Sequence, residues 1–170
     1  MSNIVVFTKK DKYIDSNAIS DVVKYVMEGS YIEKESIFLS NAYGVNQLSI
    51  DHMVKSMENV NRRNNQTEGK QIYHFVVSIY KYSATYPYRK GIAKLIQNTV
   101  GLYFYKLGYQ IISGIHDDDG YIHIHCVVNN TNFITGNKLH NIKYIFNNLL
   151  GILRKEYKDL KWEGVYYNDI

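Results

Sequence analysis

The stretch HDDDGYIHIHCVVN, residues 116–129, decides how the rest of the chain is arranged. Its second half, from residue 121, is mostly apolar and β-branched, which is typical of a β-strand. Successive side chains of a strand point to opposite faces of the sheet. One face therefore carries His123, His125, Val127 and Asn129, which include the polar members. The other is apolar throughout: Ile122, Ile124, Cys126 and Val128. We expect the apolar face to lie in the core and the polar face to carry the chemistry.

The residues just upstream predict the partner of this strand. The segment YQIISGIH, residues 109–116, is also strand-like, and the intervening residues 117–120, DDDG, are typical of a hairpin turn. Folding the hairpin brings His116 back beside His123, and His125 lies about 7 Å further along the strand. Three neutral imidazoles that face one point predict a metal site with aspartates at its rim. The alternative is that all three are ordinary hydrogen-bonded strand residues, and their number and spacing disfavour it.

Composition limits the possible classes of protein. A chain of 170 residues fits one domain, which we expect to span residues 1–170. A net charge of +4 permits nucleic-acid binding without requiring it, and the 17 tyrosines suit base stacking. The single cysteine excludes a disulfide framework and a thiolate zinc site. We find no signal peptide and no apolar run that could span a bilayer, so we expect a cytoplasmic protein with no membrane partner.

The remaining chain alternates between the two kinds of element. Strands are expected at residues 3–8, 36–41 and 71–82, and helices at 18–28, 49–60, 88–107 and 138–158. Residues 162–170 are rich in tyrosine and give no clear pattern. The order predicts an α+β fold with one layer of mainly antiparallel sheet, a central hairpin and helices packed largely on one face.

Two further segments carry candidate residues. In the strand-like run 71–82, His74 and Ser78 share a face, which repeats the polar-face pattern of the hairpin. The polar stretch 61–70 contains Arg62 and Arg63, and two interpretations stay open for it. It is either a solvated surface loop or a basic loop that faces phosphates.

The fourteen-residue stretch closely resembles the third motif of plasmid mobilisation relaxases, members of the HUH single-strand DNA endonuclease superfamily (His, hydrophobic, His). That motif has a histidine, an aspartate two residues later, then His-x-His, three apolar residues and an asparagine, and each position is present here. The resemblance extends over roughly residues 15–150, through YGVN at 43–46, YHFVVS at 73–78 and GYQIISGIH at 108–116.

The resemblance implies a metal site. His116, His123 and His125 would be the ligands, and Asp118 would be a carboxylate that orients one of them. The resemblance also implies a divalent metal cofactor, either Mn²⁺ or Mg²⁺. Three nitrogen ligands suit Mn²⁺ or a later transition metal better than Mg²⁺.

The resemblance also implies a tyrosine nucleophile late in the first helix. The segment VVKYV, residues 22–26, matches the first motif, which makes Tyr25 the candidate. The following residues, MEGSY, depart from the proline-containing turn usual in relaxases, so Tyr31 is the alternative nucleophile. Candidate DNA contacts are Ser78, which falls in the second motif, together with His74, Asn129, Arg62 and Arg63.

The implied activity is site-specific nicking and rejoining of single-stranded DNA at a plasmid or mobile-element transfer origin, through a 5′-phosphotyrosine intermediate. Accessory relaxosome proteins and coupling proteins would be its partners. A rolling-circle replication initiator is the nearest alternative, although its tyrosine usually follows the HUH pair, whereas Tyr25 precedes it. A non-catalytic single-strand DNA-binding module and a metallohydrolase acting on a small phosphoester are the others.

Overall fold

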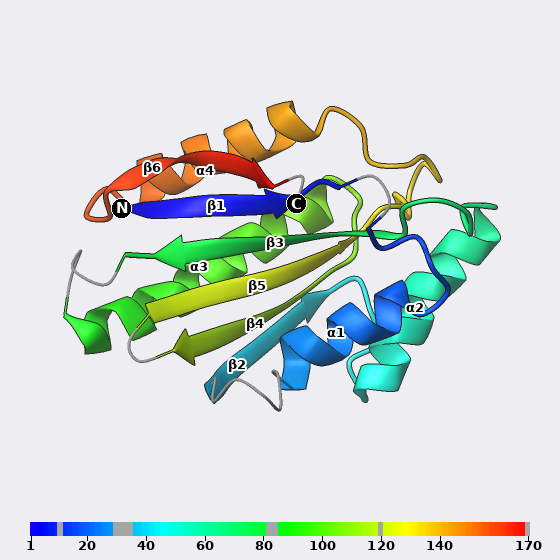
Figure 1. Cartoon of the computed structure of the whole chain (residues 1–170), viewed down its shortest axis with the longest axis horizontal. Coiled ribbons are helices and arrows are strands. Elements are labelled where there is room, and N and C mark those ends of the chain that lie inside the picture. The colour runs from blue at the N-terminus through cyan, green and yellow to red at the C-terminus, as the bar shows by residue number, and fades with distance from the viewer. Residues whose placement is uncertain (10–11, 29–35, 81–84, 119–120, 169–170) are drawn as a thin grey trace.

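The computed structural model describes residues 1–9, 12–28, 36–80, 85–118 and 121–168. Within these ranges, six strands form one sheet with four helices around it (Figure 1). The strands are β1 (Ser2–Phe7), β2 (Ser36–Tyr43), β3 (Ile72–Ile79), β4 (Ile111–Asp118), β5 (Tyr121–Asn129) and β6 (Trp162–Asn168). The helices are α1 (Ala18–Glu28), α2 (Ile50–Arg63), α3 (Tyr86–Lys106) and α4 (Ile142–Glu156).

The sheet is mainly antiparallel and is built around the predicted hairpin. Its strand order is β2-β4-β5-β3-β1-β6, and only β1 and β6 are paired in parallel. Strands β4 and β5 pair along their lengths, with His116 directly opposite His123. Strand β3 lies on the other side of β5, with Ser78 opposite His123. The α+β class, the antiparallel hairpin and its register are thus confirmed.

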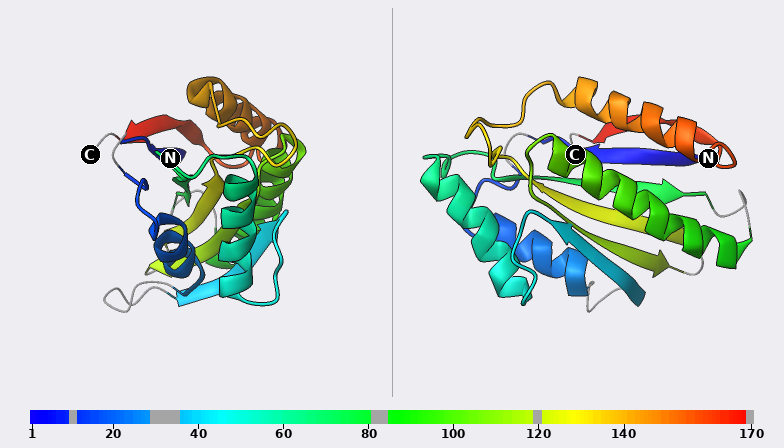
Figure 2. Two further views of the ribbon diagram at one scale, coloured as in Figure 1. Left: turned by 90° about the vertical axis from the view of Figure 1, so that its right-hand side faces the viewer. Right: turned by 180° about the vertical axis from the view of Figure 1, so that it is seen from behind.

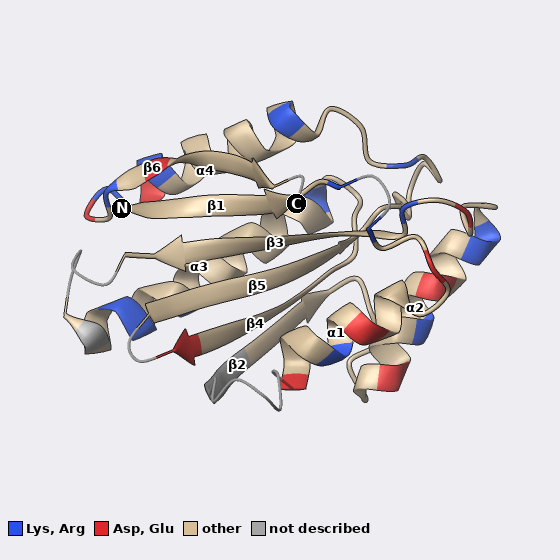
Figure 3. Cartoon of the chain, viewed as in Figure 1, with Lys and Arg blue, Asp and Glu red and all other residues tan. Residues whose placement is uncertain are grey.

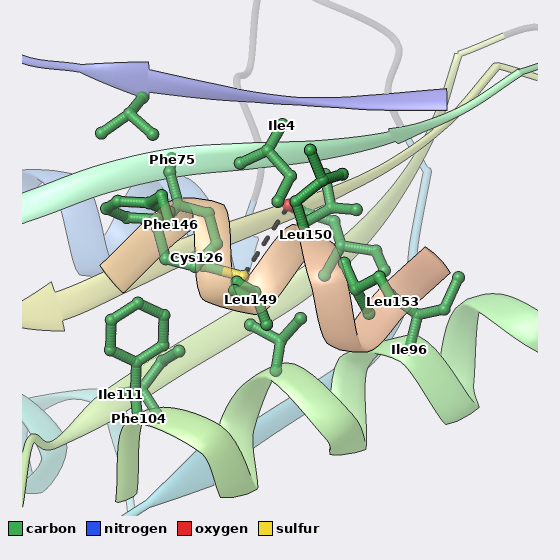
Figure 4. Close-up of a cluster of buried hydrophobic side chains, with 14 of the residues drawn as sticks. Ile4, Phe75, Ile96, Phe104, Ile111, Cys126, Phe146, Leu149, Leu150 and Leu153 are labelled. Atoms are coloured by element: carbon green, nitrogen blue, oxygen red, sulfur yellow. Dashed lines mark hydrogen bonds between the residues drawn. The ribbon is translucent and has the colours of Figure 1, made fainter. Parts of the chain in front are cut away.

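One face of the sheet forms the larger core. The apolar members of β5, from Ile122 to Val128, are fully buried, as their alternation predicts. Helices α3 and α4 cover this face (Figure 2). Phe75 of the sheet packs against Phe104 of α3 and Phe146 of α4, at ring-centroid distances of 5.4 and 4.9 Å (Figure 4). Cys126 lies among these side chains, and burial raises the pKa of its thiol, so it is an apolar packing residue.

The histidine face is covered only in part. Strands β3, β4 and β5 contribute Ile72, Ile112 and Val127 to a second apolar cluster, which α1 and α2 close. We expected helices largely on one face, but the four helices are divided between both. The reason is that the histidine face is apolar at the end where β5 finishes, so it also needs cover there. The described helices leave the β1 and β6 side of this face open (Figure 1).

Several element boundaries differ from the expected ones. Helix α2 continues to Arg63, so the polar stretch 61–70 begins inside its last turn. Helix α4 begins only after Asn141, which has φ 53° and cannot itself be helical. Strand β6 was not predicted. Among the described residues, none of the helices has the length and apolar character needed to cross a membrane.

Candidate active site

Strand register brings the three motif histidines onto one face. His116 is paired with His123, and Gly114 is paired with His125. The ring centroids of His116 and His125 are 4.4 Å apart, and those of His123 and His125 are 6.3 Å apart. His116 is fully buried and His125 nearly so, whereas His123 is half-buried. The cluster therefore opens outward at His123.

Helix α1 carries Tyr25 to these histidines. The Tyr25 ring centroid lies 5.4 Å from that of His125, 5.7 Å from His116 and 6.1 Å from His74. The ring is edge-on to His125 and His74, and the residue is half-buried. Tyr25 comes from a segment about ninety residues away in sequence, so only the docking of α1 makes it part of the site.

The docking of α1 depends on a hydrogen bond and on a glycine. His116 donates from Nε2 to the carbonyl oxygen of Val26, at 3.0 Å. A carbonyl can only accept, so His116 carries its proton on Nε2, and its lone pair is on Nδ1. At Gly114 an added Cβ would lie only 2.1 Å from the Val26 oxygen. Gly114 thus lets the helix backbone lie directly on the sheet next to Tyr25.

Two residues without a place in our predicted ligand set hold the ring of His125. Nε2 of His74 is hydrogen-bonded to Nδ1 of His125, at 3.2 Å, and the Tyr13 hydroxyl is hydrogen-bonded to Nδ1 of His74, also at 3.2 Å. Phe7 stacks on His74, with ring centroids 5.0 Å apart. Phe7 shares this face because β1 pairs with β3, a pairing that no local pattern shows. Tyr13 lies in a loop, where periodicity gives no signal.

Burial keeps both of these imidazoles neutral. Loss of solvation, with smaller effects from Lys12 and His116, lowers the pKa of His74 to about 3. Loss of solvation and the neighbouring histidines lower the pKa of His125 to about 2. A histidine must be neutral to bind a metal, so the surroundings of His125 favour its ligating form.

The donor set fits a divalent ion in its chemistry. Two imidazoles that bind one ion through bonds of about 2.1 Å have ring centroids roughly 4.5 to 6.5 Å apart. The distances in the structure are 4.4 Å for His116 and His125, just below that range, and 6.3 Å for His123 and His125, near its upper end. In the described ranges, no group of three or more His, Cys, Asp or Glu residues has its ligating atoms already gathered for a metal ion. The rings of His116, His123 and His125 would therefore turn toward a common point on binding.

The other predicted residues are placed differently from one another. Asp118 is exposed at the end of β4 and, within the described part of the chain, makes no hydrogen bond to a histidine. Ser78 is half-buried on the histidine face, opposite His123. Asn129 is fully buried and donates to the carbonyl oxygen of Met57 and to Oε1 of Gln110. We predicted a DNA contact at Asn129, but these bonds give it a structural role, tying β5 to α2.

The two arginines lie away from His123. Arg62 and Arg63 are exposed at the end of α2 (Figure 3). Their neighbour Asn61 bonds to Gln71, just before β3, whereas Ser78 lies seven residues further along. At about 3.4 Å per residue, the arginines are on the order of 20 Å from His123. Tyr31, the alternative nucleophile, falls outside the described residues.

A positive group that we did not select lies nearer the site. The Lys12 ammonium is 4.9 Å from the Phe7 ring centroid and 5.3 Å from that of Tyr13. Lys70, in the segment between α2 and β3, lies 5.4 Å from the Tyr13 ring. These cations border the Tyr13–His74–His125 group, which makes them candidates for phosphate contact.

Comparison with known proteins gives one match. The family model described as relaxase, MobA/VirD2-like, nuclease domain, matches residues 25–162. The matched region begins at Tyr25 and includes His74, His116, His123 and His125. No curated protein and no solved structure matches the chain.

Proposed function

The chain belongs to the MobA/VirD2-like relaxase family by its nuclease domain, and from this premise we propose that it cuts one phosphodiester of single-stranded DNA by transesterification, with Tyr25 as nucleophile. Nuclease domains of this family nick DNA in mobilisation. Tyr25 would form a 5′-phosphotyrosine intermediate with the help of a divalent metal. The target would be a transfer origin of a plasmid or mobile element.

The observation that carries the proposal is the position of Tyr25 over the histidine cluster. Its ring centroid lies within 5.4 to 6.1 Å of those of His125, His116 and His74. A tyrosine late in a helix is ordinarily a packing residue, and such a residue needs apolar neighbours. Tyr25 packs in part against the apolar cluster under α1, but its ring also lies against three imidazoles, which supports a role for its hydroxyl as a nucleophile.

In the proposed reaction a bond from the Tyr25 oxygen to phosphorus forms as the bond from phosphorus to the 3′ oxygen breaks. The DNA 5′ phosphate stays attached to the tyrosine, and the proton lost by the phenol is matched by the one gained by the 3′ oxygen. The aryl phosphodiester conserves the phosphodiester linkage, so attack by the 3′-OH can rejoin the strand.

His116, His123 and His125 would hold a divalent ion, Mn²⁺ or Mg²⁺. Bound there, the ion would supply positive charge to a non-bridging oxygen of the scissile phosphate. His116 is suited to ligation because its bond to the Val26 carbonyl sets its tautomer, which leaves the lone pair on Nδ1. We predicted that Asp118 orients one of these histidines; the hydrogen bond between His74 and His125 supports His74 in an orienting role at His125.

Single-stranded DNA would cross the open part of the histidine face. Ser78 lies there beside His123 and can donate a hydrogen bond to a phosphate. Lys12 and Lys70 would neutralise phosphates at one margin of that face. Arg62 and Arg63 are too distant for the scissile phosphate, so any contact from them would be to a more remote part of the strand. Accessory relaxosome and coupling proteins remain proposed partners.

The test is to trap the covalent adduct. The protein is incubated with Mn²⁺ and a pool of labelled single-stranded oligonucleotides, followed by denaturing electrophoresis and peptide mapping. We expect a protein–DNA adduct on Tyr25 that disappears in Tyr25→Phe, while folding and DNA binding are retained. Tyr144→Phe is the matched control, because Tyr144 is exposed on α4 and away from the site.

Each other outcome identifies a different function. An adduct on Tyr31 would move the nucleophile and keep the mechanism. A mobility shift without cleavage would indicate a non-catalytic binding module, and hydrolysis without an adduct would indicate a metallohydrolase. Cleavage confined to a replication origin, rather than a transfer origin, would indicate a rolling-circle initiator.

A further inference from the structure

Two hydrogen bonds join the rings of Tyr13, His74 and the proposed ligand His125. The Tyr13 hydroxyl meets Nδ1 of His74, and Nε2 of His74 meets Nδ1 of His125, each at 3.2 Å. Each ring comes from a different part of the fold: the loop before α1, strand β3 and strand β5. This hydrogen-bonded series of rings therefore forms only when β3, β5 and the loop have come together in the fold.

The backbone of Tyr13 has a disfavoured conformation, and hydrogen bonds around it hold it there. Its φ of 65° lies in the left-handed region, which L-residues other than Asn and Asp seldom adopt. Its carbonyl oxygen accepts from the backbone N–H of Gln71 at 2.8 Å, and Lys70 donates to the carbonyl of Lys12 at 3.3 Å. A backbone fixed in a disfavoured conformation by its surroundings is typical of a residue whose side chain must be placed accurately.

The two hydrogen bonds between Tyr13, His74 and His125 must run in the same donor-to-acceptor direction. A histidine that binds a metal is neutral, and each neutral imidazole of the Tyr13–His74–His125 series has one N–H donor and one acceptor nitrogen. If Tyr13 donates to His74, then His74 donates to His125, and His125 must carry its own proton on Nε2. If instead His125 donates from Nδ1, then His74 donates to the Tyr13 oxygen, and Nε2 of His125 has its lone pair available.

The second direction is the one that a metal ligand requires. It also needs a terminal group that can accept a hydrogen bond from His74, and a hydroxyl can do so in either direction. Carboxylates or carbonyls usually take this place behind a ligand histidine, and both accept only. A histidine followed by a tyrosine can reverse instead, with no change in net charge.

We propose that Tyr13 and His74 are positioning residues that select the tautomer of His125, so that Nε2 is the nitrogen offered to the metal. This inference rests on the metal role proposed above for His125. Phe7 contributes by stacking on His74 and holding its ring plane. Without the Tyr13 hydroxyl, the metal-binding direction leaves a buried N–H of His74 without that acceptor, which opposes binding.

Metal affinity of the metal-free protein tests the proposal without any DNA. Free Mn²⁺ is titrated and followed by electron paramagnetic resonance for the wild type, Tyr13→Phe, His74→Leu and His74→Gln. Loss of such an outer partner weakens metal binding by about 10- to 100-fold, so we expect about tenfold for Tyr13→Phe and more for His74→Leu. His74→Gln should recover much of the affinity, because its amide can accept from His125 and donate to Tyr13.

Tyr73→Phe is the matched control, since Tyr73 is the half-buried neighbour of His74 on the opposite face of β3. It should leave Mn²⁺ affinity unchanged. Thermal unfolding of each variant separates a loss of affinity from a loss of structure. A merely structural role would give equal affinity for His74→Gln and His74→Leu among folded protein.

Ring ¹⁵N spectra of the wild type bound to diamagnetic Zn²⁺ give a direct reading of the tautomers. We expect protons on Nδ1 of both His74 and His125. A proton on Nε2 of His74 in that state, or unchanged Mn²⁺ affinity in folded Tyr13→Phe, would overturn the inference and leave the proposed nuclease function intact. Failure of the wild type to bind any of these ions would overturn both the metal role and this inference.

Discussion

Replacing Gly114 with alanine should separate α1 from the sheet and take Tyr25 with it. The new Cβ would lie 2.1 Å from the carbonyl oxygen of Val26 and 3.4 Å from Nε2 of His116. A methyl carbon and a carbonyl oxygen are normally in contact at about 3.3 Å, so the helix must move by about 1.2 Å. The obstacle is backbone, so no side-chain rotation can relieve it.

The size of the effect follows from that displacement. Overpacking of this kind costs about 1 to 3 kcal/mol, and the bond from His116 to Val26 contributes about 1 kcal/mol more. We therefore expect Gly114→Ala to lose about 2 to 4 kcal/mol of unfolding free energy, or roughly 5 to 15 °C in Tm for a chain of this length. A shift of about 1 Å at a reacting group can cost about 100-fold in rate, so nicking should fall by a similar factor.

Urea unfolding followed by circular dichroism measures the stability, and adduct formation measures the activity. Gly151→Ala is the matched control, because Gly151 lies inside α4 with nothing within 4 Å of an added Cβ. That change should stabilise the protein by about 0.5 to 1 kcal/mol, since alanine is the better helix former. A Gly114→Ala variant as stable and as active as the wild type would refute the close docking of α1.

The remaining predictions concern charge and the histidines. The metal-free protein should lose stability in acid: burial depresses the pKa of His74 to about 3 and of His125 to about 2, so below about pH 6.5 the unfolded chain binds more protons than the folded one. Stability should therefore be complete above that pH and fall by up to about 2.7 kcal/mol per pH unit as the pH drops toward 3, and a flat urea midpoint between pH 7.5 and 5 would contradict the burial of both rings. His123→Ala should abolish metal binding and nicking but leave the urea midpoint within about 1 kcal/mol of the wild type, because this half-buried ring lies outside the core; gross unfolding would reject the assignment of faces. Arg62→Ala combined with Arg63→Ala should weaken DNA binding and make the slope of log K against log salt concentration shallower by about two units, if both side chains contact phosphates. An unchanged slope would show that the end of α2 is solvated surface that does not contact DNA.

Local pattern was sufficient for the hairpin and the two faces of β5. An alternating strand has only one register that buries Ile122 and Ile124 while exposing His123, because a shift by one residue exchanges the faces. The short DDDG turn then places His116 opposite His123. The metal-ligand set could be proposed from sequence for this reason: its members are close in the chain and their geometry is that of one hairpin.

Strand β6 shows where local pattern fails. Residues 162–168 lack clear alternation, and their burial is intermediate at most positions and never complete. They form a strand because they pair in parallel with the edge of β1. The polypeptide comes to that edge only after α4 has crossed the other face of the sheet. Such pairing depends on the sheet already being formed, so the segment itself carries little signal.

The division of roles among the predicted site residues was also decided by the tertiary structure. Asn129 belongs to the motif and shares the histidine parity, yet α2 covers its end of the strand and uses its amide. His74 lies on the same face but is buried by Phe7 and bonded at both nitrogens, so it contacts Tyr13 and His125 rather than solvent. Parity assigns a face to a residue, but what lies above that face comes from other elements.

The sequence by itself determined the sheet hairpin, the identity of the three imidazoles and the family, because these depend on residues that are near each other along the chain. Only the tertiary structure decided that Tyr25 lies over those imidazoles and that Tyr13 and His74 stand behind His125. Those placements depend on a glycine that admits a helix backbone and on strand pairings between distant segments. Such contacts form between surfaces that exist only after folding, so no spacing within the sequence encodes them.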